Sequence, residues 1–195
     1  MKSDIVIIFD WDDTLFPTSW VIRQGIKISE ISDTNKFIVY FSELDNALYD
    51  LLKTSILLGD VFIITNANMQ WIKLSKKLLR KSSILIDKYV NIISARDNYK
   101  EIYDIDEWKI HTFRNDIINH IAIADQVISI GDAKYEYDAL ISLKDYTQTK
   151  KLLKNIRFMS LPTFNTILDQ ISVITKSIND ISQHKGHLDL KFSNM

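Results

Sequence analysis

The 195-residue sequence has no cysteine, only four glycines and two prolines, and no long uninterrupted apolar stretch. The absence of cysteine excludes disulfides, thiolate metal sites and a cysteine nucleophile. No apolar run approaches the roughly 20 residues that a helix needs to cross a bilayer, so we expect no transmembrane segment. An apolar run starts as early as Ile5 and leaves no room for a signal peptide before it. We therefore expect a soluble, cytoplasmic protein.

An excess of either charge is also missing, because 24 Lys and Arg residues nearly balance 25 Asp and Glu residues. The formal net charge of -1 argues against general nucleic-acid binding, which needs a positive surface. With 46% apolar and 25% charged residues, the composition is ordinary for a soluble globular protein. The length fits one domain with a full hydrophobic core.

What the sequence does contain is an apolar, β-branched and aromatic run over Ile5–Phe9, followed at once by Asp10, Asp12 and Thr14. Such a run predicts a central parallel strand that is buried on both faces. Residues two apart in an extended chain project the same way, so Asp10 and Asp12 would face a common volume. Two such carboxylates repel each other unless a metal ion or a shared proton relieves them. The pair suits a nucleophile beside a general acid/base or a divalent metal site, and the alternative is an acidic turn.

The rest of the chain alternates short apolar runs with amphipathic stretches, which predicts an α/β fold. Four further strands are expected over Val61–Ile64, Val90–Ser94, Gln126–Asp132 and Ile156–Met159. Apolar residues spaced by three and four predict helices over about 33–58, 69–81, 108–121 and beyond Pro162. Two segments are expected to be irregular: 17–29, as a hairpin turning at Gln24-Gly25, and 96–107, as a loop over the strand ends.

Polar residues follow the second strand, at the edge where open α/β sheets place their ligands. Thr65 presents a hydroxyl at the strand end, although a helix cap is the ordinary alternative. Asn66 offers a backbone N–H at a helix start, which favours an anion. Lys109 stands in the first turn of a helix, where the helix dipole disfavours a cation. This position argues against a purely structural role for the lysine. Lys100 is the alternative cation.

The fourth predicted strand ends in a carboxylate, Asp132, as the first strand is followed by Asp10. Acidic residues at two strand ends, Asp10 and Asp132, provide oxygen ligands for one hard cation, most naturally Mg²⁺. Glu136 follows at short spacing and is placed to support the metal site from its second layer, with Asp138 as the alternative. The sequence therefore predicts a magnesium site.

The stretch Asp10-Trp-Asp-Asp-Thr-Leu15 resembles the first motif of the haloacid dehalogenase (HAD) superfamily, Asp-x-Asp-x-Thr after a hydrophobic strand. The resemblance implies that Asp10 is a phosphoryl-accepting nucleophile and Asp12 the general acid/base. The position between Asp12 and Thr14 is often Gly in that family and is Asp13 here. Asp12 argues against a dehalogenase, because the second acid marks phosphoryl transfer in this family.

Three further motifs of the family have counterparts, two of them at strand ends and one at the start of a helix. By this resemblance the Thr65 hydroxyl binds the phosphoryl group with Asn66 beside it, and Lys109 neutralises the phosphate and the nucleophile. Gly131-Asp132 matches the fourth motif. The resemblance implies that Mg²⁺ is bound by the carboxylates of Asp10 and Asp132 and the backbone carbonyl of Asp12, with Glu136 in support.

The fold implied by the resemblance is a Rossmann-like, doubly wound parallel sheet with strand order 5-4-1-2-3, helices on both faces and no large cap domain. The catalytic core is expected over residues 1–183, and residues 184–195 as a polar tail or linker. The implied activity is that of a Mg²⁺-dependent phosphomonoesterase that forms an aspartyl phosphate.

Without a cap, a bulky substrate has to exclude water from the site, which favours a phosphoprotein carrying phosphotyrosine, phosphoserine or phosphothreonine. A small-metabolite phosphatase, a nucleic-acid 3′-phosphatase and a phosphotransferase or phosphomutase remain as alternatives. A non-catalytic phosphate-binding module is the alternative from another class. Such a module would dock to a membrane through the basic stretch 69–81, although a solvated helix face accounts for those charges more simply.

Overall fold

The computed structural model describes residues 4–144, 146 and 150–193, and its centre is an open sheet of six parallel strands in the order β3-β2-β1-β4-β5-β6. The strands are β1 (Ile5–Phe9), β2 (Asp60–Thr65), β3 (Val90–Ser94), β4 (Gln126–Gly131), β5 (Leu152–Arg157) and β6 (Leu188–Lys191). Since all strands run the same way, their carboxyl ends meet at one edge of the sheet.

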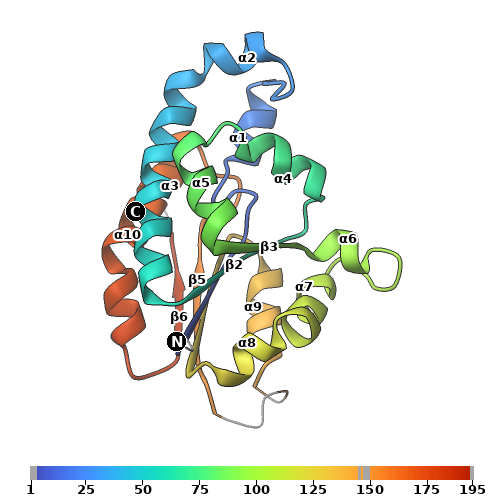
Figure 1. The fold of residues 1–195 in the computed structure, drawn as a ribbon, viewed down its shortest axis with the longest axis vertical. Coiled ribbons are helices and arrows are strands. Elements are labelled where there is room, and N and C mark those ends of the chain that lie inside the picture. The colour runs from blue at the N-terminus through green and yellow to red at the C-terminus, as the bar shows by residue number, and fades with distance from the viewer. Residues whose placement is uncertain (1–3, 145, 147–149, 194–195) are drawn as a thin grey trace.

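Helices connect the strands and cover both faces of the sheet (Figure 1). One face carries α3 (Ile38–Leu58), α5 (Arg80–Tyr89) and α10 (Phe164–Gln183). The other carries α7 (Trp108–His111), a π-helical turn η1 (Thr112–Asp116), α8 (Ile118–Ile123) and α9 (Lys134–Ile141). Shorter helices lie around the carboxyl ends of the strands: α1 (Thr18–Arg23), α4 (Met69–Lys76) and α6 (Ala95–Tyr99). Another short helix, α2 (Ile31–Lys36), lies farther out, at the top of the view in Figure 1.

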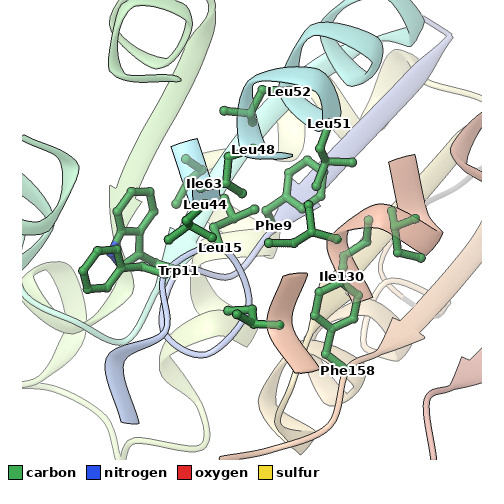
Figure 2. Close-up of a cluster of buried hydrophobic side chains, with 14 of the residues drawn as sticks. Phe9, Trp11, Leu15, Leu44, Leu48, Leu51, Leu52, Ile63, Ile130 and Phe158 are labelled. Carbon is green, nitrogen blue, oxygen red and sulfur yellow. The ribbon is translucent and has the colours of Figure 1, made fainter. Parts of the chain in front are cut away.

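The side chains of β1 alternate between two apolar cores, one on each face of the sheet. Ile7 and Phe9 belong to the core under α3 and α10, whereas Val6 and Ile8 belong to the core under α8 and α9. Figure 2 shows Trp11 and Leu15, from the turn after β1, packed in the first of these cores with leucines of α3. The turn that carries the carboxylates is therefore anchored by buried apolar side chains on either side of them.

The predicted Rossmann-like α/β class is confirmed, and the predicted order 5-4-1-2-3 is present as β5-β4-β1-β2-β3. The segments 16–60 and 66–107, which the structure describes in full, consist of α1 to α3 and of α4, α5, β3 and α6. These segments hold no separately folded cap. None of the described helices is long and apolar enough to cross a membrane.

The sequence interpretation missed the sixth strand, because residues 184–195 were expected to be a polar tail. Leu188–Lys191 instead pair in parallel with β5, and the ring of Phe192 packs on Phe158 at a centroid distance of 5.2 Å. The alternation of Leu188 and Leu190 with polar residues was the available signal, but the strand is only four residues long. Residues 1–3 and 194–195, at the ends of the two predicted ranges, lie outside the described residues.

The hairpin predicted over 17–29 was also wrong, because Thr18–Arg23 form α1. Gly25 (φ 65°) follows this helix, donates its N–H to Ile22 O at 3.0 Å, and is followed by Ile26, whose N–H reaches Val21 O at 3.1 Å. These two bonds form a Schellman motif, which ends helices at a glycine. The glycine that was interpreted as a hairpin turn therefore marks a helix C-terminus.

The basic stretch 69–81 is not one helix, since α4 ends at Lys76 and α5 begins at Arg80. Lys76 is paired with Asp87, and Lys81 Nζ donates to Asn46 Oδ1 at 2.6 Å. Two of the five positively charged side chains are thus engaged within the protein, and the five are divided between two helices and the turn that joins them. The predicted loop 96–107 likewise starts with a helical turn, α6, whose N-terminus is capped by Ser94.

Candidate active site

The carboxyl ends of β1, β2 and β4 bring together the candidate residues that the sequence places beyond separate strands. Asp10 directly follows β1, and its N–H donates to Ile130 O of β4 at 2.9 Å, which continues the sheet bonding by one residue. The Asp10 side chain is only 7% exposed. The first carboxylate of the motif is therefore held by the sheet itself.

The turn after Asp10 depends on Asp13, which has the left-handed φ of 55° that favours glycine. Asp tolerates this conformation better than most residues, because its short side chain bonds locally. Asp13 N–H donates to Phe16 O at 2.7 Å, and its Oδ1 accepts the Ser19 N–H at 2.8 Å, while Ser19 Oγ donates to its Oδ2. Asp13 thus forms the turn at a position where the resembled motif often has glycine, and ties the turn to the start of α1.

Lys109, from the first turn of α7, lies at the centre of the site. Its ammonium donates to Asp10 Oδ1 at 2.5 Å and to Glu136 Oε1, and the Lys109 side chain is 2% exposed. Burial alone would lower the pKa of Lys109, but the two carboxylates outweigh it and raise the pKa. The ammonium therefore stays charged at neutral pH and neutralises part of a strongly acidic site.

Glu136 reaches Lys109 because of the glycine at the end of β4. A Cβ on Gly131 would lie 2.2 Å from Glu136 Cγ and 2.6 Å from Oε2, so any larger residue would displace the carboxylate. Glu136 Oε2 also accepts the Ala133 N–H at 3.0 Å in the first turn of α9. The Gly-Asp motif is thus explained in part by the space that Glu136 needs.

The geometry separates the preferred candidates from the alternatives. Lys100 forms an exposed 3.6 Å pair with Glu101, so Lys109 is the lysine that reaches Asp10. Asp138 pairs with Lys134 at 3.1 Å on the outer side of α9, so Glu136 is the acid that faces the site.

Asp12 is held by two donors that the sequence interpretation did not identify. Trp71 Nε1–H of α4 donates to Asp12 Oδ1 at 2.8 Å, and Thr18 Oγ1 of α1 donates to the same oxygen. Burial raises the pKa of Asp12, while both hydrogen bonds counteract it by stabilising the ionised form. The net effect is a pKa of Asp12 above its ordinary value, with the two donors limiting the increase.

Trp71 could not be recognised from spacing, because it lies 59 positions from Asp12 and its helical pattern resembles that of a core residue. Trp20 and Arg23 belong to α1, which follows the acidic turn in the chain, but both have partners in the fold. Trp20 is buried in an aromatic cluster, with Phe164 at 5.0 Å, and Arg23 donates to Pro162 O. Both have structural roles.

Thr65 ends β2 and is fully buried, and its Oγ1 accepts the Ala67 N–H at 3.0 Å. The hydroxyl proton is left for another acceptor, so the turn contact and phosphoryl binding are compatible. Asn66 Nδ2 donates to Ile105 O at 3.5 Å and thereby ties the segment after α6 to the site. Asn68 caps α4 by accepting the Trp71 N–H at 2.8 Å, which fixes the indole that holds Asp12.

Negative charge predominates in the site. Asp10, Asp12, Asp13, Asp132 and Glu136 interact electrostatically, and Lys109 opposes them with one positive charge. Burial, followed by the charges of Glu136 and Asp13, raises the pKa of Asp132 to about 7. Burial, only partly opposed by Lys109, also raises the pKa of Asp10. A bound cation would lower the pKa of both carboxyls.

Within the described residues, no group of three or more His, Cys, Asp or Glu side chains is arranged so that it could hold a metal ion. The predicted Mg²⁺ ligands include only two side chains, the carboxylates of Asp10 and Asp132, together with the backbone carbonyl of Asp12. Mg²⁺ often takes only one or two carboxylates and completes its shell with water and substrate phosphate. With the excess of negative charge, these residues fit a divalent cation.

No family model matches the sequence, and no curated protein matches it. The fold is similar to that of the Legionella pneumophila effector Ceg4 in its crystal structure, with a TM-score of 0.53. The two sequences are 15% identical, and the match covers 89% of this chain and 95% of that one. A likeness at this identity shows the fold alone.

Proposed function

We propose that this protein is a Mg²⁺-dependent phosphomonoesterase of the HAD type that acts on phosphoproteins through an aspartyl-phosphate intermediate. The observation that carries the proposal is the cluster of Asp10, Lys109 and Glu136, buried at the carboxyl ends of the strands with Asp12 beside it. A purely structural site would be expected to pair its buried charges, whereas here the acids outnumber the cation.

In the first step, Asp10 Oδ2 attacks phosphorus, since Lys109 holds the other oxygen, Oδ1. The bond from phosphorus to the leaving oxygen breaks as Asp12 gives that oxygen a proton. Lys109 offsets the negative charge that would otherwise repel a carboxylate nucleophile from a phosphate, and the Thr65 hydroxyl donates to a phosphoryl oxygen.

In the second step, Asp12 takes a proton from water, and the water oxygen displaces Asp10 from phosphorus. Trp71 and Thr18 stabilise the ionised Asp12 that this step needs. When bound, Mg²⁺ would supply further positive charge for the phosphoryl oxygens, with Asp10, Asp132 and the Asp12 carbonyl as its ligands.

Hydrolysis of p-nitrophenyl phosphate with and without Mg²⁺ tests the proposal. Asp10→Asn keeps the shape of the side chain but removes the attacking charge, so it should lower kcat at least about a hundredfold, or ~3 kcal/mol. Asp138→Asn, an equal change on the outer side of α9, should leave kcat unchanged. Circular dichroism checks that both variants fold. Activity of Asp10→Asn near the wild-type level would rule out covalent catalysis by Asp10.

The metal assignment has its own test. Asp132→Asn removes one proposed ligand, so it should raise the Mg²⁺ concentration needed for half-maximal activity. An unchanged Mg²⁺ titration would remove Asp132 from the site. If the wild-type protein binds phosphate but hydrolyses no phosphomonoester, a non-catalytic phosphate-binding module replaces the proposal.

A further inference from the structure

A hollow of about 450 Å³ opens beside Asp12. Its volume is in the range of ligand pockets and exceeds what a phosphoryl group alone requires. Its lining comes from α1, the turn between β2 and α4, α4 itself and α6: Thr18, Ile22, Asn66, Ala67, Asn68, Trp71 and Arg96. The hollow therefore adjoins the general acid and is formed by segments that surround the carboxyl ends of the strands.

The position of Asp12 indicates which part of a substrate enters this hollow. A general acid must touch the oxygen that leaves, so the leaving group has to occupy space next to the Asp12 carboxylate. Asp12 contributes to the lining of the hollow, whereas Asp10 and Lys109 are buried and do not line it. The hollow is thus on the leaving-group side of the reaction, which for a phosphoprotein is the peptide.

The apolar part of the hollow is rigid on one side and exposed on the other. Trp71 is fixed by the bond from its indole to Asp12, by the Asn68 cap, and by edge-to-face packing on Phe16 at 6.0 Å. Ile22, on α1, is 68% exposed. An exposed isoleucine beside a fixed indole offers apolar contact to a side chain or aromatic ring of the substrate.

Arg96 gives the hollow a positive charge on α6. The side chain is exposed, and no hydrogen bond or ion pair to the described part of the chain engages it. Because the catalytic carboxylates repel acidic groups from the interior of the site, an acidic group of the substrate would be drawn outward to Arg96. A free guanidinium is suited to bind a carboxylate through two parallel hydrogen bonds.

We propose that this hollow binds the peptide that carries the phosphate and that Arg96 selects peptides with Asp or Glu next to the phosphorylated residue. The inference rests on the proposed function and adds to it the sequence context of the substrate. Trp71 and Ile22 contact the apolar part of the phosphorylated residue, and Arg96 contacts the flanking carboxylate.

The test compares kcat/KM on synthetic phosphopeptides that are identical except for Asp or Lys beside the phosphorylated residue. The wild type should prefer the Asp peptide by roughly three- to fivefold, the size of an exposed ion pair. Arg96→Gln should abolish the preference, and Arg96→Glu should reverse it. Arg80→Glu, the same charge change on an exposed arginine that does not line the hollow, should retain the wild-type preference.

p-Nitrophenyl phosphate separates this inference from the proposed function, because it has no flanking carboxylate. Both Arg96 variants should still hydrolyse it, because Asp10, Asp12 and Lys109 are unchanged, and the Asp-to-Lys preference is read as a ratio within each protein. If every protein hydrolyses it but Arg96→Glu keeps the preference for the Asp peptide, the selecting role of Arg96 is overturned while the phosphatase stands. A 3′-phosphorylated oligonucleotide that exceeds the best peptide in kcat/KM would overturn the peptide assignment. If the wild type hydrolyses no phosphomonoester, the function fails and the inference with it.

Discussion

Two of the buried lysines, Lys109 and Lys154, have opposite surroundings. Lys109 is 2% exposed and pairs with two carboxylates, Asp10 and Glu136, at the carboxyl ends of the strands. Lys154 of β5 is 0% exposed and donates to neutral oxygens: Gln126 Oε1 at 2.5 Å, Ile181 O at 2.6 Å and Ser182 O at 3.1 Å. One ammonium neutralises acids, and the other binds the last carbonyls of α10.

Under the proposed function, Lys109 is buried for catalysis and Lys154 for stability. Lys154 satisfies all three of its donors and stabilises the negative end of a helix dipole, which is a role in stability. Lys109 leaves its surroundings acidic even after pairing, because five carboxylates oppose one ammonium. Such an excess costs stability, and its retention is typical of catalytic sites. The pKa values reflect the same contrast: the carboxylates raise the pKa of Lys109, and burial lowers that of Lys154.

The largest effect is expected for Lys109→Met, which leaves two carboxylates buried without their cation. We expect a loss of about 3–5 kcal/mol in the free energy of unfolding, measured in urea, because an unpaired buried charge is costly. Phosphatase activity should fall at least about a hundredfold. The control is Lys100→Met, which removes an exposed lysine paired with Glu101 and should change neither quantity. Unchanged stability in Lys109→Met would contradict the burial described for this cluster.

Gly131→Ala should disturb the same cluster without removing a charge. The added Cβ would collide with Glu136, and the overpacking should cost about 1–3 kcal/mol. Because Glu136 positions Lys109, the variant should also lose activity. A displacement of the Lys109 ammonium near 1 Å should lower kcat by roughly a hundredfold. A crystal structure of the variant should show Glu136 moved away from Lys109. Wild-type kcat in this variant would mean that the Glu136–Lys109 contact is not required.

Lys154→Met should lower the stability of the protein without lowering its activity, in contrast to Lys109→Met. Three acceptors lose their donor, so we expect a loss of about 1–3 kcal/mol in the free energy of unfolding. Activity at saturating substrate should stay at the wild-type level, since Lys154 does not contact the site. Lys176→Met, on the exposed side of α10, is the matched control and should leave stability unchanged. A loss of kcat in Lys154→Met would break the distinction between the two lysines.

The smallest effect concerns the pH dependence of stability. Burial, reinforced by Lys185, lowers the pKa of Lys154 in the folded state below the ordinary value of about 10.4. Between these two values the unfolded chain holds more protons than the folded one, so the contribution of Lys154 to stability rises with pH. The difference in unfolding free energy between wild type and Lys154→Met should therefore grow from pH 8 to pH 10.5. A difference that shrinks over this range would show that the pKa is raised instead.

Much of the fold was predictable because its signals are local. The apolar run Ile5–Phe9 predicted β1, and the runs at 61–64 and 90–94 predicted β2 and β3. The failures came from short elements with competing interpretations. Gly25 suits a hairpin turn as well as a helix C-terminus, and the four residues of β6 carry too little periodicity to distinguish a strand from a tail.

The sequence by itself determined which candidate residues stand at strand ends, because a strand and the residue that follows it are adjacent in the chain. Asp10, Thr65 and Asp132 could be placed in this way. Lys109 was assigned to the site through the family resemblance, with Lys100 as the alternative. The tertiary structure decided between these two lysines and brought Trp71 to Asp12. The contact of Lys109 with Asp10 spans 99 positions, and that of Trp71 with Asp12 spans 59. Such contacts follow from the packing of helices across the sheet, which no local periodicity encodes.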